Sequence, residues 1–353
     1  EIAAEIKRLY NDGAIHFNDT TTHVVMELAQ SEVSPQSAPM FVETLYDLLS
    51  HTDRSEFKDD LKLFCTGEGT KILDALVKCC EIKELNLKHV AMLISCLAYV
   101  TNNNSDTQKY LYDHNIIDGV QSLLLHPQIL VVFEQLFNNF DFATKATDTM
   151  TNAEFVTALL SALLVLTNNC VDVQKELAER GIIELLCKLL ENALDAPEEL
   201  MVVYATLISV IDCYVESSMD LLPNLVVKSI INIAFQAKKV GIRLTAYKAL
   251  TDIANQKKDR FRQTFVDLVQ KVADGFNESE PLKQASLLLF KAIANDEKIE
   301  TFHLIPHLSR IIEILEVDNE TALCAVEAMN AIALRDDALS ILQIGRASCR
   351  ERV

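Results

Sequence analysis

The chain has 353 residues, half of them hydrophobic, with few glycines and prolines and no tryptophan. This composition excludes a disordered chain and predicts a folded, helical protein. The formal net charge of −19 argues against a broad nucleic-acid surface, which needs Lys and Arg for the phosphates, and against binding to anionic membranes. The acidity either keeps a long apolar protein soluble or attracts a basic partner.

Most of the nine cysteines lie in apolar helical patterns, and no CxxC pair occurs. This usage predicts buried, reduced thiols in a cytoplasmic protein, with the nucleus as the alternative compartment. No apolar run has the length of a membrane span. Because the chain starts at Glu1, we expect that it is truncated there, and we expect the same after Gln343.

The first part of the chain, residues 1–69, predicts helices without a clear repeat. Helical patterns cover Glu1–Tyr10, Thr20–Gln30 and Ala38–Leu49, and a short charged segment follows at Phe57–Phe64. Two further helices are predicted at Thr70–Cys80 and Leu87–Val100.

A repeated unit becomes visible in the next part of the chain. Ser95–Leu125 and Ser161–Glu191 share an apolar helix, a Thr-Asn-Asn break, a short amphipathic helix and a second apolar helix. In the later copy the short helix is predicted at Asp172–Glu179, and a turn at Gly181 precedes the apolar helix Ile182–Leu190. An internal repeat of this kind predicts stacked helical units, since each unit can bury its apolar faces only against its neighbours.

The repeat units can be counted by the polar break that follows each long apolar helix. They lie at Asn103, Asn139, Asn169, Asp212, Asn255 and Asn295, and Leu334 stands at the last one. Most spacings are near 40 residues, the period of armadillo or HEAT units. The step from Asn139 to Asn169 is shorter and contains a Thr-rich polar stretch near 141–152. We interpret it as a loop replacing the first two helices of a unit, either a surface insertion or a local irregularity.

The motif Asn-Asn-x-x-Asp-x-Gln-Lys-x-Leu, followed by Ile-Ile and Leu-Leu, resembles the armadillo-repeat family. The resemblance covers about Leu87–Leu125 and Asn152–Glu191, and it is more HEAT-like from Glu198 to Leu342. It implies an all-α, armadillo-like right-handed α-solenoid of stacked two- and three-helix repeats, continuous from Glu1 to about Gln343. Residues 1–69 form its helical N-terminal part, in which the repeat is unclear, and residues 70–343 carry the armadillo/HEAT-like repeats. The same fold serves many functions, so the resemblance does not identify the partner.

The last ten residues, Ile344–Val353, read IGRASCRERV. This stretch is similar to the translation of a common sequencing-library adapter, and we expect it to be an artefact outside the fold.

The breaks also supply the candidate partner-binding residues, which are Asn103, Asn169, Asn255 and Asn295. As turn and cap residues they need no ligand. As a ladder along the third helices they would hold the backbone of an extended peptide. Armadillo proteins that bind nuclear localisation signals pair such an Asn ladder with tryptophans, and the absence of Trp argues against that recognition here.

Other motifs favour ordinary structural roles. His303 and His307 have the spacing of metal ligands on a helix, but Pro306 lies between them and no third ligand is arranged nearby. The adjacent Cys79 and Cys80 are typical of a helical core. The basic cluster Lys257–Arg262 is typical of a solvated helix start, with an anchor for an acidic motif as the alternative. Gly67-Glu68-Gly69 lacks the features of a phosphate loop.

The sequence therefore predicts a non-catalytic protein-binding scaffold that holds a partner segment in the groove of its third helices. We expect a protein or peptide partner, of basic character if the acidic charge takes part, and no cofactor, metal, nucleic acid, membrane or small-molecule substrate. Two alternatives remain open: a chaperone or assembly factor of the UCS myosin-chaperone type, and the regulatory region of a larger protein.

Overall fold

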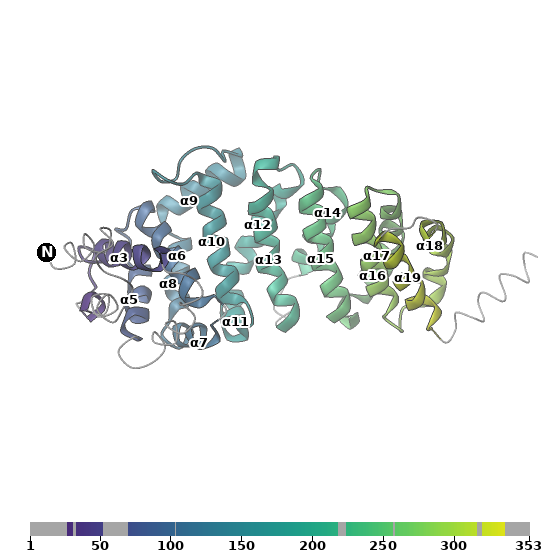
Figure 1. Cartoon of the computed structure of the whole chain (residues 1–353), viewed down its shortest axis with the longest axis horizontal. Coiled ribbons are helices and arrows are strands. Elements are labelled where there is room, and N and C mark those ends of the chain that lie inside the picture. The colour runs from purple at the N-terminus through teal and green to yellow at the C-terminus, as the bar shows by residue number, and fades with distance from the viewer. Residues whose placement is uncertain are drawn as a thin grey trace, which may run out of the picture. The chain divides into compact units, whose positions relative to one another are not determined.

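The computed structural model describes residues 27–30, 33–51, 70–102, 104–217, 224–256, 258–315 and 320–335 (Figure 1). In these ranges the chain consists of helices joined by turns and loops, and its extended pairing is limited to one isolated bridge between Lys145 and Thr151. The predicted all-α class is confirmed. The chain divides into two compact units, residues 1–192 and 193–353, which are described separately.

The described helices of the first unit are α3 (Ala38–His51), α5 (Thr70–Cys80), α6 (Leu87–Thr101), α7 (Ser105–Asp113), α8 (Ile116–Leu124), α9 (Pro127–Phe133), the π-helical turn η2 (Glu134–Asn138), α10 (Asn152–Thr167), α11 (Val171–Glu179) and α12 (Ile182–Leu190). These bounds agree with the sequence predictions to within a few residues wherever both exist. The helix predicted at Glu1–Tyr10, the charged segment Phe57–Phe64 and most of the helix predicted at Thr20–Gln30 lie outside the described residues.

Local capping explains where the repeated helices begin. The side chain of Asn86 accepts a hydrogen bond from His89 N at 3.0 Å at the start of α6, and Asn104 does the same for Thr107 N at 3.1 Å at the start of α7. A capping box of Thr151 and Glu154 begins α10. The third residue of the Asn102–Asn104 break is therefore a helix cap.

The long helices of the first unit pack side by side in one layer, the position expected for the third helix of each repeat. α3 packs against α6, and α6 packs against α10, while α5 and α8 pack against each other. Leu97, Val100, Leu163 and Leu166 lie within this core with at most 2% of their surface exposed. α7, α8 and α10 thus have the order of a three-helix unit, short, short and long.

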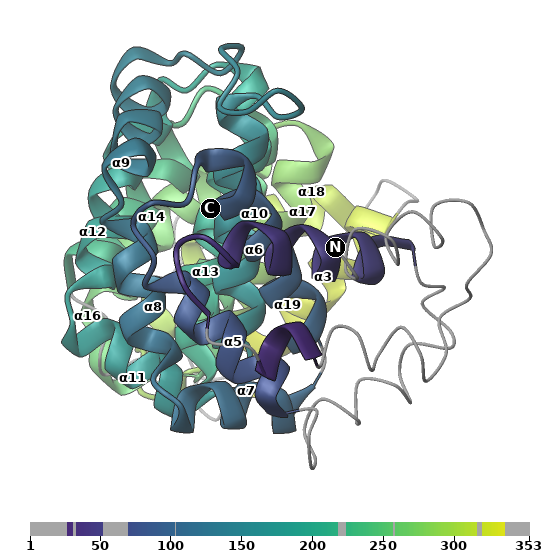
Figure 2. The same ribbon diagram turned by 90° about the vertical axis from the view of Figure 1, so that its left-hand side faces the viewer.

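An insertion separates the second and third helices of this unit, and it corrects one sequence prediction. α9, η2 and the loop up to Thr151 follow α8, and Asn139 ends the π-helical turn rather than a third helix. α9 lies at the opposite end of the unit from α7 and α11 (Figure 2). The irregular loop near 141–152 exists, with Asn152 already in α10. It replaces no helices, because α7 and α8 supply the first two.

Hydrogen bonds fix the insertion to the rest of the unit. The fully buried Asn152 donates from Nδ2 to Gln135 Oε1 and to the carbonyl of Asp141, both at 3.1 Å. Asn192 donates to the carbonyl of Phe137 at 2.7 Å. Asn152 and Asn192 therefore hold η2 and the start of the loop that follows it.

The second unit contains α13 (Met201–Ser217), α14 (Asn224–Gln236), α15 (Val240–Gln256), α16 (Lys258–Asp274), α17 (Glu280–Ala294), α18 (Leu308–Leu315), α19 (Glu320–Ala333) and the 3-10 turns η4 (Glu198–Leu200), η6 (Gly275–Asn277), η7 (Thr301–His303) and η8 (Ile305–His307). α14, α16 and α18 pack on α15, α17 and α19, respectively, and the long helices α13, α15, α17 and α19 pack side by side in this order (Figure 1). The predicted HEAT-like helix pairs are confirmed in this unit.

The layers of the second unit approach closely at Gly275. A Cβ atom at this position would lie 2.1 Å from Ser286 Oγ and 3.2 Å from the hydroxyl of Tyr247. Tyr247 and Ser286 are themselves buried in α15 and α17. Glycine is therefore required sterically where α16 ends against the two long helices.

Among the described residues, no single helix is both long and apolar enough to cross a membrane. Ile116–Leu124 and Pro127–Asn138 reach that length and composition only together, across a bend of 58°.

Candidate partner-binding face

The predicted asparagines occupy different backbone settings. Asn103 lies outside the described residues. Asn169 is exposed and has a φ of 59° in the turn after α10, a left-handed conformation that Asn tolerates better than most residues. This geometry supports the turn interpretation of Asn169, and a partner-binding role for it stays a prediction.

Asn255 and Asn295 lie at the carboxyl ends of neighbouring long helices in the second unit. Asn255 is exposed in the last turn of α15, and Asn295 is the exposed C-cap residue of α17. Because α15 and α17 pack side by side, the structure brings these two positions to one end of the same stack. Asn169 belongs to the other unit.

The stacking of the long helices in the second unit leaves one stripe of each helix accessible to solvent. On α13, α15 and α17, residues three or four positions apart are exposed or half-buried, whereas the positions between them are largely buried. On α19 the accessible stripe is broader, and Val326 is exposed as well. We call this surface the long-helix face. It consists of Val202, Thr206, Ser209 and Asp212 on α13; Thr245, Lys248, Asp252 and Asn255 on α15; Gln284, Leu288 and Lys291 on α17, with Asn295 directly after it; and Leu323, Glu327 and Asn330 on α19, with Leu334 directly after it.

Ion pairs cross the long-helix face from one helix to the next. Lys248 Nζ lies 2.6 Å from Asp212 Oδ2 and 3.0 Å from Asp252 Oδ2, and Lys291 Nζ lies 3.1 Å from Glu327 Oε2. Burial raises the pKa of Asp212, and Lys248 only partly offsets this effect. Burial also opposes the charge of Lys248, but the two carboxylates raise its pKa beyond that effect. The face is thus a mixture of apolar side chains and paired charges.

The first unit has a similar pair between its long helices. Glu43 on α3 accepts a hydrogen bond from Lys88 Nζ at 2.7 Å, and His89 Nε2 lies 3.2 Å from the same carboxylate. Both partners are on α6. Cross-helix pairing of this kind therefore recurs in both units.

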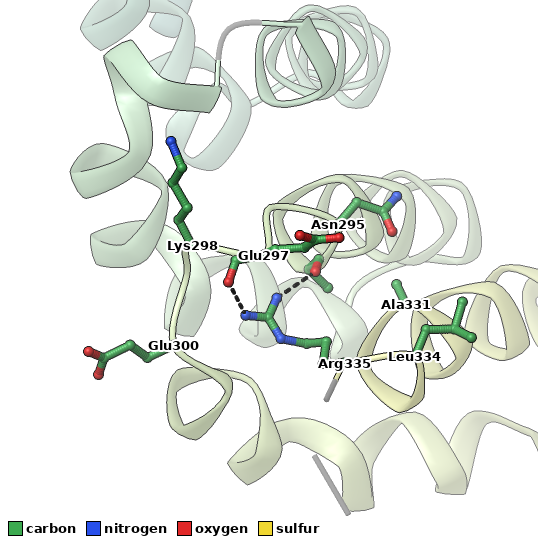
Figure 3. Close-up of a pocket in the computed structure, with 8 residues that line it drawn as sticks. Asn295, Glu297, Lys298, Glu300, Ala331, Leu334 and Arg335 are labelled. Atoms are coloured by element: carbon green, nitrogen blue, oxygen red, sulfur yellow. Dashed lines mark hydrogen bonds between the residues drawn. The ribbon is translucent and has the colours of Figure 1, made fainter. Parts of the chain in front are cut away.

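A hollow of about 530 Å³ opens where the carboxyl ends of α17 and α19 meet, as the close-up in Figure 3 shows. It is lined by Ala294, Asn295, Glu297, Lys298, Glu300, Ala331, Leu334 and Arg335. The predicted residue Asn295 is therefore part of a concave surface, at the edge of the long-helix face.

Arg335 forms the floor of this hollow, and the sequence analysis did not identify it. Its guanidinium donates hydrogen bonds to Thr301 Oγ1 at 2.8 Å and to the carbonyls of Ala294 at 2.8 Å, of Asp296 and Glu297 at 3.1 Å each, and of Ile299. An Arg at the end of an apolar helix gives no sequence signal for this role, because the acceptors lie in the preceding layer.

Two buried glutamines were also missed, although their repetition was a usable signal. Gln108 Nε2 donates to the carbonyl of Val165 at 2.6 Å and to that of Asn168 at 3.3 Å, and Gln174 Nε2 donates to the carbonyl of Thr167 at 2.8 Å. Both side chains are at least 95% buried. The Gln of the repeated motif therefore binds carbonyls at the end of α10 that have no partner within the helix.

The other sequence candidates are structural. His307 is buried and packs edge-on against Phe290, with 5.9 Å between ring centroids, and burial lowers its pKa. Burial raises the pKa of the Cys79 thiol to about 12 and raises the pKa of the Cys80 thiol well above its ordinary value, which disfavours reactive thiolates. In the basic cluster, Arg262 pairs with Asp259 and Asp296 at the start of α16, where Lys257 lies outside the described residues.

No protein-family model matches the chain, and no curated protein matches it. Solved structures with similar folds include a designed armadillo repeat protein in complex with the peptide (KR)4, at 15% identity and a TM-score of 0.40, covering 87% of this chain and 98% of that one. Two engineered proteins match at 14% and 13% identity with TM-scores of 0.41 and 0.36, covering 94% and 88% of this chain and 91% and 96% of theirs. Likenesses this remote transfer no function.

Proposed function

We propose that the chain is a non-catalytic scaffold that binds a segment of a protein partner on the face of its long helices. The observation that carries the proposal is the long-helix face, which combines exposed apolar side chains with charges already paired across helices. Val202 and Leu323 have 57% and 63% of their surface exposed, and Leu288 has 39%. Apolar residues set among polar ones are typical of protein interfaces.

Asn255 and Asn295 are exposed members of this face, and we propose that their side-chain amides hydrogen-bond to the backbone of the partner. For Asn103 and Asn169 the same role remains a prediction from the repeat. A partner of basic character fits the formal charge of −19, because opposite charge accelerates encounter.

The test is affinity capture from lysate with the chain ended at Gln343, followed by mass spectrometry. The variant Val202→Arg/Leu288→Arg places two cations on exposed positions of the long-helix face. We expect its captured proteins to fall by about ten-fold, since an interface core rarely tolerates such a change. The helical circular dichroism should be unchanged.

A matched control is Ile312→Arg, which changes a residue of α18 that is 51% exposed and lies off the long helices. Capture by this variant should equal that of the unaltered chain. Equal capture by all three proteins would contradict the proposed face.

A further inference from the structure

The last helix pair of the second unit, α18 and α19, exposes apolar positions that the preceding pair keeps buried. At most positions its burial matches that of the residue 39 positions earlier in the chain, in α16, η6 or α17. Six positions differ, because they are buried in the earlier pair and exposed or half-buried in the later one. We call these six the terminal stripe: Leu308, Ile312 and Leu315 on α18, and Val326, Met329 and Ala333 on α19.

The counterparts of the terminal stripe lie at the boundary between the two helix pairs. They are Val269, Ala273, Phe276, Leu287, Phe290 and Ala294, none with more than 3% of its surface exposed. Phe290 packs edge-on against His307, directly before α18, and Arg335 after α19 donates to the carbonyl of Ala294. Since α17 also packs against α19, the terminal stripe occupies on α18 and α19 the positions that form this boundary one layer earlier.

The chemistry of the terminal stripe is that of an interior surface. All six residues are apolar, and Ile312 and Val326 have 51% and 41% of their surface exposed. The last repeat of a solenoid normally presents a polar outer face, because apolar surface left in water costs free energy. α18 and α19 lack such a face along this stripe, so they have the composition of an internal pair.

The sequence after Arg335 predicts the start of another helix. Two aspartates, Asp336 and Asp337, precede apolar residues at helical spacing, which are Ala338, Leu339, Ile341 and Leu342. Acidic residues are favoured in the first turn of a helix, and α16 begins in this way, with Asp259 in its first turn soon after the end of α15. Residues 336–343 lie outside the described part of the chain.

We propose that the terminal stripe is covered by a further helix pair of the same kind, whose first helix begins at Asp336 and whose long helix follows Gln343. The long helix packs against Val326, Met329 and Ala333, as α19 packs against α17, and the first helix covers the stripe on α18. The proposal does not depend on partner binding. It extends the long-helix face by one helix beyond α19.

The test appends a second copy of residues 297–335 directly after Arg335, so that a helix pair of the chain's own sequence follows α19 at the spacing of the repeat. We expect the helical circular dichroism to increase and the amide exchange of α19 to slow by about ten-fold or more, because neighbouring pairs stabilise each other. The variant Ile312→Glu/Val326→Glu, made in the original pair only, should leave the added copy unprotected, since folding would bury two carboxylates.

The matched control is Leu130→Glu/Val131→Glu on α9 in the first unit, where the two residues are 41% and 52% exposed. It should leave the protection of the added copy unchanged. An added copy that exchanges freely in the unaltered chain, or that folds as well with Ile312→Glu/Val326→Glu as with the control, would overturn the proposal. So would a chain ended at Gln343 that sediments as a dimer and becomes monomeric with Ile312→Glu/Val326→Glu, because a second copy would then cover the stripe.

Discussion

The two units differ in the side chains that hydrogen-bond to the last carbonyls of their long helices. The last carbonyls of any helix lack partners within the helix, and packing against another layer removes the water that would otherwise bind them. In the first unit two neutral amides, Gln108 and Gln174, bind the end of α10. In the second unit the guanidinium of Arg335 binds the end of α17 and the loop beyond it.

The same contrast extends to other helices of the second unit. Arg243 Nε donates to the carbonyl of Ala234 at the end of α14 at 2.9 Å, and Arg310 donates to Asp274 at the end of α16 at 3.2 Å. Arg243 also pairs with Glu278, and Arg310 Nη1 also donates to the carbonyl of Ala273 at 3.5 Å, so both arginines combine an ion pair with a contact to the end of a helix. The glutamines are buried amides, whereas these arginines remain partly accessible to water.

The difference has an energetic consequence. Removing a buried neutral cap leaves a carbonyl that has neither water nor a hydrogen-bond donor, so the fold loses the full desolvation free energy of that carbonyl. This loss does not depend on salt. A partly exposed arginine forms more bonds, but water can replace some of them, and salt screens its ionic contacts. The first unit should therefore depend on few irreplaceable residues and the second on many weaker contacts.

The largest expected effect is that of Gln174→Ala in the first unit. The change leaves the Thr167 carbonyl without this donor in a fully buried site and adds a small cavity, so we expect a loss of about 2–3 kcal/mol. Amide hydrogen exchange of α10 and α11 measures this loss of stability locally. The matched control Gln128→Ala, at an exposed position of α9, should cost less than about 0.5 kcal/mol. Similar losses for the two variants would contradict the capping role.

A smaller effect is expected for Arg335→Ala in the second unit. Five hydrogen bonds are lost, but the half-buried site admits water, so we expect about 1–2 kcal/mol in the hydrogen exchange of α17 and α19. Arg335→Lys keeps the charge but not the fork of donors, and it should recover less than half of the loss. Full recovery by Lys would mean that charge, rather than capping of the loop, is what Arg335 contributes.

Much of the fold could be predicted because the signals are local. The apolar spacing of Thr70–Cys80 and Ile182–Leu190 specified helices whose bounds the structure reproduces, and the Asn pair of residues 168–169 marked a turn with a left-handed residue. The change from three-helix to two-helix repeats was also visible as a change in motif after Glu198.

The error at Asn139 shows where local signals end. Phe-Asn-Asn after an apolar stretch has the same pattern as a true third-helix end, yet here it closes an insertion. Only packing distinguishes the two, since α6 contacts α10 directly. The hollow was missed for the same reason, because Asn295 and Arg335 are brought together by the stacking of α17 and α19.

The smallest expected effect is a change in the pH dependence of stability, which should occur for a charged contact of the second unit and not for the neutral caps of the first. Hydrogen bonds from Lys298 and Arg262 lower the pKa of Asp259 in the second unit to about 2. A carboxyl whose pKa is lower in the folded state stabilises the fold above its unfolded pKa of about 4 and loses this contribution as pH falls through about 2. Asp259→Asn should therefore lower the melting temperature slightly at pH 6.

The difference between Asp259→Asn and the unaltered chain should close towards pH 2, because the native carboxyl is then neutral as well. Asp259 is exposed, so the change in melting temperature is expected to be small and to shrink further in high salt. The cost of Gln174→Ala, an uncharged contact, should instead stay constant over the same pH range. If the Gln174 variant changed with pH and the Asp259 variant did not, the assignment of neutral caps to one unit and charged contacts to the other would be wrong.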